Sequence, residues 1–171
     1  PDARAKVWPT RSAAPGGRAG CRGWCSFGRS GHPRVRVAGP LRDRLVQLVR
    51  RHTRLPRDQA AQLEVLQRVQ LDLDRDKALD RLYSVALVDR EADRYVFRFS
   101  GLVLVRGAAP APILLRRQDA DAIVVRGTLD LEGDGRRELW LLHTPSDGEG
   151  TAHVVLALDD AWQPVLLGRH A

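Results

Sequence analysis

Apolar residues recur at helical spacing in residues 41–69. The first apolar stripe consists of Leu41, Leu45, Leu48 and Val49. These positions lie on one helical face, and Pro40 suits the first turn of such a helix because an N–H at that position would have no partner. The second stripe consists of Leu63, Leu66 and Val69. Pro56 stands where a second helix would begin, so the pattern predicts a helical hairpin with its break at residues 52–55.

From residue 70 onward apolar positions alternate with polar ones, which indicates strands. Two clear alternations are formed by Tyr83, Val85 and Leu87 and by Tyr95, Phe97 and Phe99. Shorter apolar runs follow at residues 102–105, 113–115, 123–125, 139–142, 154–158 and 165–167. The loops between them are too short for helical crossovers, which favours an antiparallel meander. We therefore predict a mainly β fold, on the α+β border, with residues 70–171 as its β domain.

The β region contains one acidic turn twice. The segment DLDRDKALD begins at Asp72, and the segment DLEGDGRRE begins at Asp130. Positions 1, 3, 5 and 9 are acidic in both, namely Asp72, Asp74, Asp76 and Asp80 in the first copy and Asp130, Glu132, Asp134 and Glu138 in the second. Each copy leads into an apolar run, a polar loop and another strand. The alignment predicts two degenerate β-hairpin repeats, at about residues 70–127 and 128–171.

The spacing of these acids suits a calcium ion. Calcium takes roughly six to eight oxygen ligands, and carboxylates at alternate positions of a tight loop converge on one point. Position 7 usually offers its backbone carbonyl, here that of Ala78 or Arg136, and the acid at position 9 closes the sphere directly or through water. A helix–loop–helix calcium hand is excluded, because Tyr83 and Leu141 replace the Glu that it requires at position 12.

Both copies resemble the DxDxDGxxD calcium loop of FG-GAP and VCBS-type β repeats, which occur in integrin-like propellers and in many bacterial envelope proteins. The resemblance is confined to the two acidic segments and the run that follows each. It implies that calcium binds between strands of each repeat through the acidic positions given above. We expect a weak affinity, on the order of 0.1 to 1 mM as in extracellular modules, so that calcium is a structural clip.

The copies differ at the glycine positions of this motif. The second copy has Gly133 and Gly135, whereas the first has Arg75 and Lys77. If the first loop has the standard conformation, Lys77 must adopt a positive φ, which is unfavourable for a residue with a side chain. Two repeats are too few to close a propeller, so the sequence predicts a compact sheet or a sandwich of two hairpin units.

A metal-free interpretation of the same turns stays open. Asp side chains can accept hydrogen bonds from nearby backbone N–H groups and so form Asx turns without any ion. In that case the acidic positions would serve only to connect strands.

Charge is divided unevenly along the chain. The formal net charge is +7, but residues 1–57 hold 14 of the 28 Lys and Arg and 2 of the 21 Asp and Glu, which leaves about −5 for residues 58–171. Residues 1–40 also hold 12 of the 25 Gly and Pro, a composition that cannot offset chain entropy by burial. We expect a disordered basic leader there. Binding of nucleic acid or another polyanion through this leader is the alternative function.

Two further sets of residues are candidate metal ligands. The N-terminal part contains Cys21, Cys25, His32 and His52. Their spacing fits no standard zinc finger, so unligated thiols are the preferred interpretation. His143 and His153 flank residues 145–150 and can face each other across a hairpin, although two ordinary strand histidines are the preferred interpretation.

We expect no catalysis. The sequence shows no nucleophile motif, no phosphate-cradling glycine loop and no catalytic pair of acids outside the two turns. No apolar run reaches membrane-spanning length, so no membrane span is expected. No signal peptide is visible, and the resemblance alone points to the bacterial periplasm, the cell surface or secretion. The expected role is a rigid non-catalytic module for an unknown protein or glycan partner.

Overall fold

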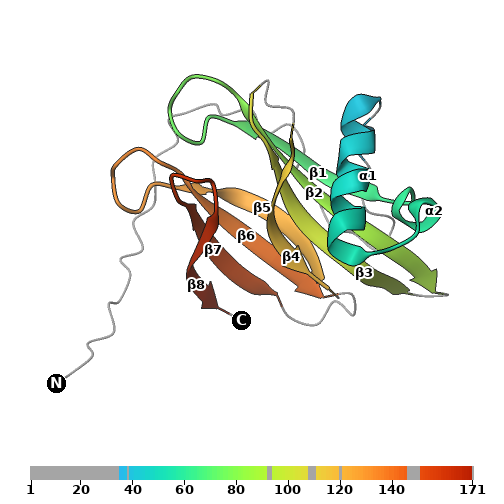
Figure 1. Ribbon diagram of the computed structural model, residues 1–171. Coiled ribbons are helices and arrows are strands. Elements are labelled where there is room, and N and C mark those ends of the chain that lie inside the picture. Colours follow the sequence, from blue (N-terminus) through green and yellow to red (C-terminus); the bar gives the residue numbers. More distant parts are fainter. Residues whose placement is uncertain are drawn as a thin grey trace.

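The computed structural model shows two four-stranded antiparallel sheets and one long helix, which confirms the mainly β prediction (Figure 1). It describes residues 35–37, 39–91, 94–107, 111–119, 121–145 and 151–170. The first sheet consists, in spatial order, of β1 (Glu64–Leu71), β2 (Asp80–Glu91), β3 (Arg94–Val105) and β4 (Ile113–Gln118). The second consists of β5 (Asp121–Leu129), β6 (Glu138–Pro145), β7 (Ala152–Leu158) and β8 (Pro164–His170). Residues 1–34 of the predicted leader lie outside the described residues.

The first predicted helix is confirmed as α1 (Pro40–Thr53). Its buried residues are Leu45, Leu48 and Val49. The helix ends where Arg54 adopts a left-handed conformation with φ of 58°, and the Arg54 N–H donates to the Arg50 carbonyl at 2.9 Å. α1 lies across one face of the first sheet (Figure 1). No helix in the described ranges is long and apolar enough to cross a membrane.

The second predicted helix is much shorter than its apolar stripe implied. α2 (Arg57–Ala60) is a single turn, and the chain then enters β1. The pairing of β1 with β2 shifts register between Val65 and Gln67, so Leu66 lies at a β-bulge. Because the bulge adds one residue, Val65 and Leu66 are both buried and the alternation of apolar and polar positions is lost. The apolar spacing that remains in β1 imitates a helical stripe.

The two sheets are two copies of one unit. Leu71 pairs with Asp80 at the end of the first hairpin, and Leu129 pairs with Glu138 at the corresponding place in the second. Each unit begins one strand before its acidic turn and continues as a four-stranded meander. β5 therefore opens the second unit, whereas our boundary at residues 127 and 128 assigned it to the first.

The units pack as layers, with the first sheet between α1 and the second sheet. The core between α1 and the first sheet includes Leu45, Val49, Leu63, Tyr83, Val85 and Phe99. The core between the sheets includes Leu82, Leu102, Leu104, Ile123, Leu141 and Val154. This arrangement agrees with the predicted sandwich of two units.

The free edge of β5 is closed by polar side chains of the first sheet. The Ser84 hydroxyl donates to the Ile123 carbonyl, and the Ile123 N–H donates to Ser100 Oγ at 3.2 Å. The Gln67 amide donates to the Val125 carbonyl at 3.0 Å and accepts from the Val125 N–H at 2.8 Å. These bonds satisfy backbone groups that an unpaired sheet edge would leave exposed, and they fix the second sheet against the first.

Candidate functional site

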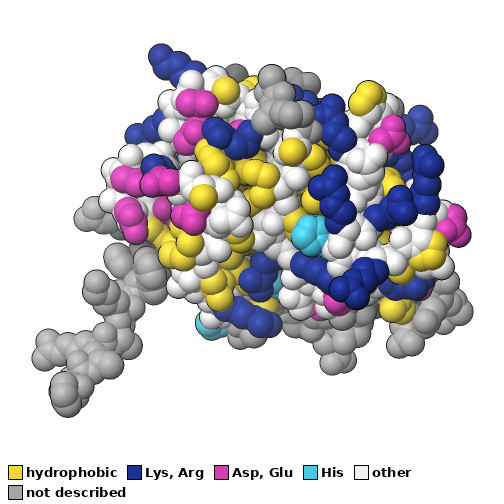
Figure 2. Space-filling model, viewed as in Figure 1, with side chains coloured by type: hydrophobic (Ala, Val, Ile, Leu, Met, Phe, Trp, Pro, Cys, Tyr) yellow, Lys and Arg dark blue, Asp and Glu magenta, His cyan; other side chains and the backbone are white. Residues whose placement is uncertain are grey.

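The two acidic turns lie side by side at one end of the molecule. Residues 72–79 connect β1 to β2, and residues 130–137 connect β5 to β6. The Arg137 N–H donates to the Leu73 carbonyl at 3.1 Å, so the backbones of the two loops touch. Figure 2 shows Asp and Glu side chains gathered over this end, whereas Lys and Arg are spread over the rest of the visible face. A strand follows each loop, as the sequence predicts.

The two loops have the same backbone conformation. Positive φ angles occur at Arg75 (62°), Lys77 (68°), Gly133 (73°) and Gly135 (90°). The positive φ predicted for Lys77 is thus confirmed. The first acid of each loop bonds to the second of these positions: Asp72 Oδ2 accepts the Lys77 N–H at 3.0 Å, and Asp130 Oδ1 accepts the Gly135 N–H at 3.4 Å. These equivalent bonds hold the first copy in a conformation that glycine adopts more easily.

The acid at position 9 closes the base of each loop from inside. Asp80 is 2% exposed, and its Oδ2 accepts the Leu73 N–H at 3.3 Å. Glu138 is 4% exposed, and its Oε2 accepts the Leu131 N–H at 2.9 Å. Burial is the main cause that raises the pKa of Asp80, against the lowering effects of the Leu73 bond and of the Arg106 charge. Both acids therefore bind loop backbone in addition to any role toward an ion.

In the first loop three carboxylates converge. Oxygen atoms of Asp72, Asp74 and Asp76 lie within 4.8 Å of one another. Asp72 Oδ1 is shielded from solvent and has no hydrogen-bond partner. The bonds of an Asx turn are present as well, because Asp74 Oδ1 accepts the Asp76 N–H at 3.3 Å and Asp76 Oδ1 accepts the Ala78 N–H at 2.7 Å. The loop therefore combines backbone-bonded carboxylates with one buried oxygen that lacks a donor.

The second loop does not gather its acids in this way. Among the described residues, Asp130, Glu132 and Asp134 do not form a comparable cluster, and all three are exposed. Asp134 Oδ1 accepts the Arg136 N–H at 2.8 Å, and the Arg136 guanidinium lies 2.6 Å from Asp160. Of the predicted site residues, the structure thus brings together the three acids of the first copy alone.

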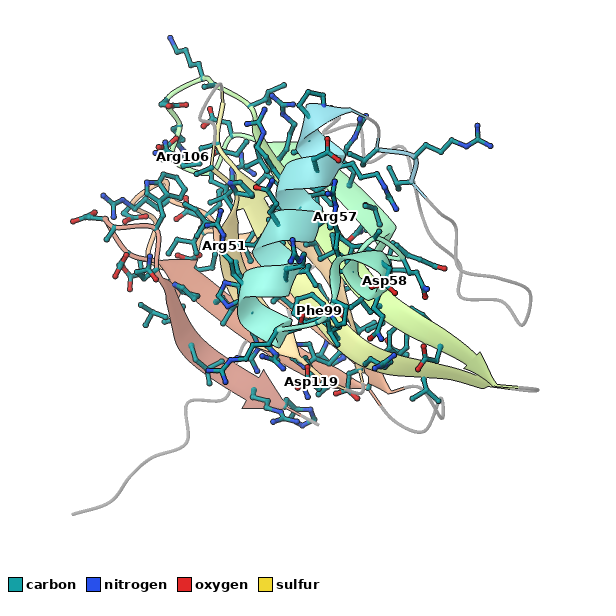
Figure 3. All side chains as sticks on the ribbon, turned by 45° about the vertical axis from the view of Figure 1, so that its right-hand side comes forward. Arg51, Arg57, Asp58, Phe99, Arg106 and Asp119 are labelled. Atoms are coloured by element: carbon teal, nitrogen blue, oxygen red, sulfur yellow. The ribbon has the colours of Figure 1, made fainter. Side chains whose placement is uncertain are left out.

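Arg106 is the central residue that the sequence did not reveal. Its Nη2 lies 3.0 Å from Asp74 Oδ2 and 3.9 Å from Asp76 Oδ2, and its Nε lies 3.7 Å from Asp80 Oδ1. The guanidinium is stacked on the Trp162 ring, 3.6 Å from its centroid. Figure 3 shows Arg106 at the loop end, far from Asp119. These partners are distant in sequence, so no local pattern could have indicated the contact.

Arg75 links the first loop to the second. Its Nη2 donates to Asp130 Oδ2 at 3.1 Å. The same guanidinium lies over Gly135, at a place where any side chain on that residue would collide with it. The absence of a side chain at Gly135 thus admits the arginine of the neighbouring loop.

Comparisons of the chain with protein-family models, with curated proteins and with solved structures give no match. The functional conclusion rests on the geometry of the loops.

A cleft of about 310 Å³ opens between the two loops and the β7–β8 turn. Its lining includes Asp74, Glu132, Asp134, Arg137, Asp159 and Trp162. Asp159 organises the turn, because its Oδ1 accepts the N–H groups of Ala161 at 2.9 Å and Gln163 at 2.7 Å. Trp162 is held there with φ of 61°. The cleft combines negative charge with one aromatic wall, a lining that suits a polar partner.

His143 and His153 do not form a site together. His143 pairs with Ala152 and His153 pairs with Leu142, so the two histidines lie on opposite faces of the second sheet. His153 Nδ1 accepts from the Trp140 indole N–H at 3.0 Å. His52 is exposed in α1, and the cysteines and His32 lie outside the described residues.

Proposed function

We propose that residues 72–79 bind one calcium ion as a structural clip in a non-catalytic repeat module of the FG-GAP or VCBS type. The observation that carries this proposal is Asp72 Oδ1, a carboxylate oxygen shielded from solvent, without a hydrogen-bond partner and next to the carboxylates of Asp74 and Asp76. An unpaired carboxylate oxygen costs free energy, and a cation within reach of all three carboxylates would remove that cost. Hard carboxylate oxygens are the ligands that calcium prefers.

The donor set of the first loop fits this ion. Asp72, Asp74 and Asp76 would hold it, with the Ala78 carbonyl as the further ligand that the resemblance implies. Calcium would supply two positive charges at the point where the carboxylates repel one another. Asp80, which is bound to Leu73, would support the loop from below. Arg106 now neutralises part of the same negative charge, so calcium and Arg106 would compete for Asp74 and Asp76.

The proposed role of the clip is to hold the rim of the neighbouring cleft. Asp74 belongs both to the acidic cluster and to the lining of the cleft, which Trp162 lines as well. A loop fixed by calcium would present this acidic and aromatic surface to a protein or glycan partner with little loss of entropy on binding. In this proposal the module works in the bacterial envelope or outside the cell, where calcium reaches the concentrations that a weak site requires.

Chemical unfolding of the full chain in excess chelator and in about 10 mM calcium tests the proposal. For a dissociation constant on the order of 0.1 to 1 mM, calcium should raise the free energy of unfolding by about 1.4 to 2.7 kcal/mol. Asp72→Asn should remove this increment, because it removes one ligand charge. Asp130→Asn is the matched control, since Asp130 makes the equivalent backbone bond in the loop whose acids do not converge.

The same measurement on Arg106→Gln examines the competition. Without calcium this variant should be less stable than the wild type, because three acids lose their counter-charge. Its calcium increment should be larger, because calcium no longer displaces a guanidinium. An increment that is equal in wild type, Asp72→Asn and Asp130→Asn would overturn the proposal and leave the acidic turns as metal-free Asx turns.

A further inference from the structure

Two arginines, one in each sheet, lie on the sheet faces that line the layer between the sheets. Arg116 in β4 pairs with Leu102, and Arg169 in β8 pairs with Val154. Residues directly opposite each other in an antiparallel pair share one face of the sheet. Leu102 and Val154 both belong to the core between the sheets, so the two arginines lie on the faces that line this layer. Arg116 is half-buried, whereas Arg169, on the edge strand β8, is exposed.

Neither arginine has a counter-ion among the described residues. Among the residues that the structure describes, no carboxylate forms an ion pair with Arg116 or Arg169, and Arg116 Nε is shielded from solvent without a hydrogen-bond partner. The pKa of Arg116 is lowered, first by burial and then by the charge of Arg169. By contrast, the neighbouring Arg117 is exposed and lies 3.0 Å from Asp119. A half-buried guanidinium that has no ion pair and lies near a second positive charge costs free energy.

His143 lies in the same layer. It is 1% exposed and pairs with Ile123, another member of the core between the sheets. Neither of its ring nitrogens has a hydrogen-bond partner. Burial lowers the pKa of His143, and the charges of Arg116 and Arg169 lower it further, whereas Asp121 opposes them. Asp121 is itself engaged, because its Oδ2 accepts from the Gln118 amide at 3.2 Å.

We propose that Arg116, Arg169 and His143 form a binding site for a small divalent oxyanion of the phosphate and sulfate class. Guanidinium groups donate paired N–H bonds in the geometry that oxyanions accept, and an imidazole N–H adds a further donor. One anion would supply the missing acceptors and the missing negative charge together. Because His143 is 1% exposed, the anion that reaches it is a small free ion rather than the phosphate of a polymer.

This site is distinct from the acidic loops. Arg116 pairs with Leu102 in β3, and Leu102 pairs with Ser84 in β2, four residues beyond Asp80. In β6, His143 lies five residues beyond Glu138. At about 3.3 Å per residue of strand, the two sites are roughly 13 to 17 Å apart. Calcium and anion binding are therefore separate properties, and failure of one leaves the other in place.

Calorimetric titration of the full chain with sodium sulfate, at constant ionic strength maintained with chloride, tests the proposal. We expect one sulfate per chain, with Arg116→Gln and Arg169→Gln each weakening binding by at least about tenfold. Arg117→Gln is the matched control, because it removes the same charge from the next residue, which lies on the opposite face of the sheet beside α1. It should change the affinity by less than about twofold. Equal weakening by Arg116→Gln and Arg117→Gln would show that sulfate responds to net charge, and the proposal would fall.

A second measurement uses the wild-type chain and needs no variant to fold. The pKa of His143 is followed by NMR with and without saturating sulfate, which stays doubly charged throughout the titration. A bound anion favours the imidazolium, so the pKa of His143 should rise and sulfate should bind more tightly at lower pH. An unchanged pKa would exclude His143 from the site. Tighter binding of a single-stranded oligonucleotide than of sulfate, also lost in Arg116→Gln, would replace the small ion by a polymer and overturn the proposal.

Discussion

In the first acidic loop three carboxylates converge and Arg106 lies against them, whereas in the second loop the equivalent acids are exposed and do not come together. Both loops nevertheless have the same pair of positive φ angles, at Arg75 and Lys77 in one and at two glycines in the other. The same backbone bonds recur in both, including that from the first acid to the sixth position of the loop.

The acids that maintain the turn differ from the acids whose surroundings favour a ligand. The acids at positions 1 and 9 bond to backbone N–H groups in both copies, so they maintain the turn whether or not an ion is present. Positions 3 and 5 differ in their surroundings between the copies, because Arg106 approaches Asp74 and Asp76 in the first loop alone. The repeat thus conserves its conformation while the chemistry of its acids has diverged.

The largest effect should come from the acids at position 9. Asp80→Ala leaves the N–H of Leu73 without an acceptor, and Leu73 is 3% exposed, so we expect a loss of about 3 kcal/mol in the free energy of unfolding. Glu138→Ala should cost less, about 1 kcal/mol, because Leu131 is 42% exposed and water can replace the lost acceptor. Urea unfolding of both variants in chelator measures the difference.

Asp80→Asn is the control for this pair, because it keeps an acceptor for Leu73 and removes a charge whose burial raises the pKa of Asp80. It should be clearly more stable than Asp80→Ala. Equal losses in the Asp80 and Glu138 alanine variants would contradict the view that burial of the bonded N–H decides the cost.

The next largest effect on stability should come from His143, whose equivalent in the first sheet is Val85. In the first unit Val85 pairs with Val65 under α1. The equivalent pair of the second unit, His143 and Ile123, lies 58 residues further along the chain. His143→Leu should therefore give the second unit an apolar residue like that of the first and remove two unpartnered ring nitrogens. We expect a gain of about 1 kcal/mol at neutral pH, measured by urea unfolding in buffer without phosphate or sulfate.

The pH dependence of this gain has a definite sign. The folded state lowers the pKa of His143 below its ordinary value of 6.5, mainly through burial, so the unfolded chain binds the proton more readily. The contribution of the neutral imidazole to stability is complete above that pH and is lost as the pH falls through the lowered value. Wild type should lose stability on acidification more steeply than His143→Leu. Parallel pH profiles would show that His143 finds a partner for its proton in the folded state.

The sequence was sufficient to predict the strands from β2 onward and the acidic turns, because both depend on local patterns. Alternating residues such as Tyr83 and Val85 mark strand faces, and the acids at fixed spacing mark the turns. The start of the first sheet was missed because the bulge at Leu66 interrupts alternation within a short strand. A bulge is determined by the pairing with β2, which no local pattern reports.

The chemistry around the loops could not be predicted for a related reason. Arg106 and Trp162 follow different strands, and only the packing of one unit on the other brings them into contact. The same holds for Arg116 and Arg169, whose shared layer depends on the register of β4 and of β8. Long-range juxtapositions of single charged residues carry no periodic signal along a sequence.

The smallest effect should come from the positive φ angles themselves. A residue with a side chain loses about 1 to 2 kcal/mol in the left-handed conformation, and glycine loses roughly 0.5 to 1 kcal/mol of chain entropy on folding. Lys77→Gly should therefore stabilise the chain by about 0.5 to 1 kcal/mol. Gly133→Arg places a side chain at a positive φ in the second loop, at the position equivalent to Arg75 and with open space around it. It should destabilise the chain by a similar amount. If Lys77→Gly instead lowered stability in chelator, the Lys77 side chain would contribute more than its backbone conformation costs, and the first copy would be adapted to its arginine and lysine.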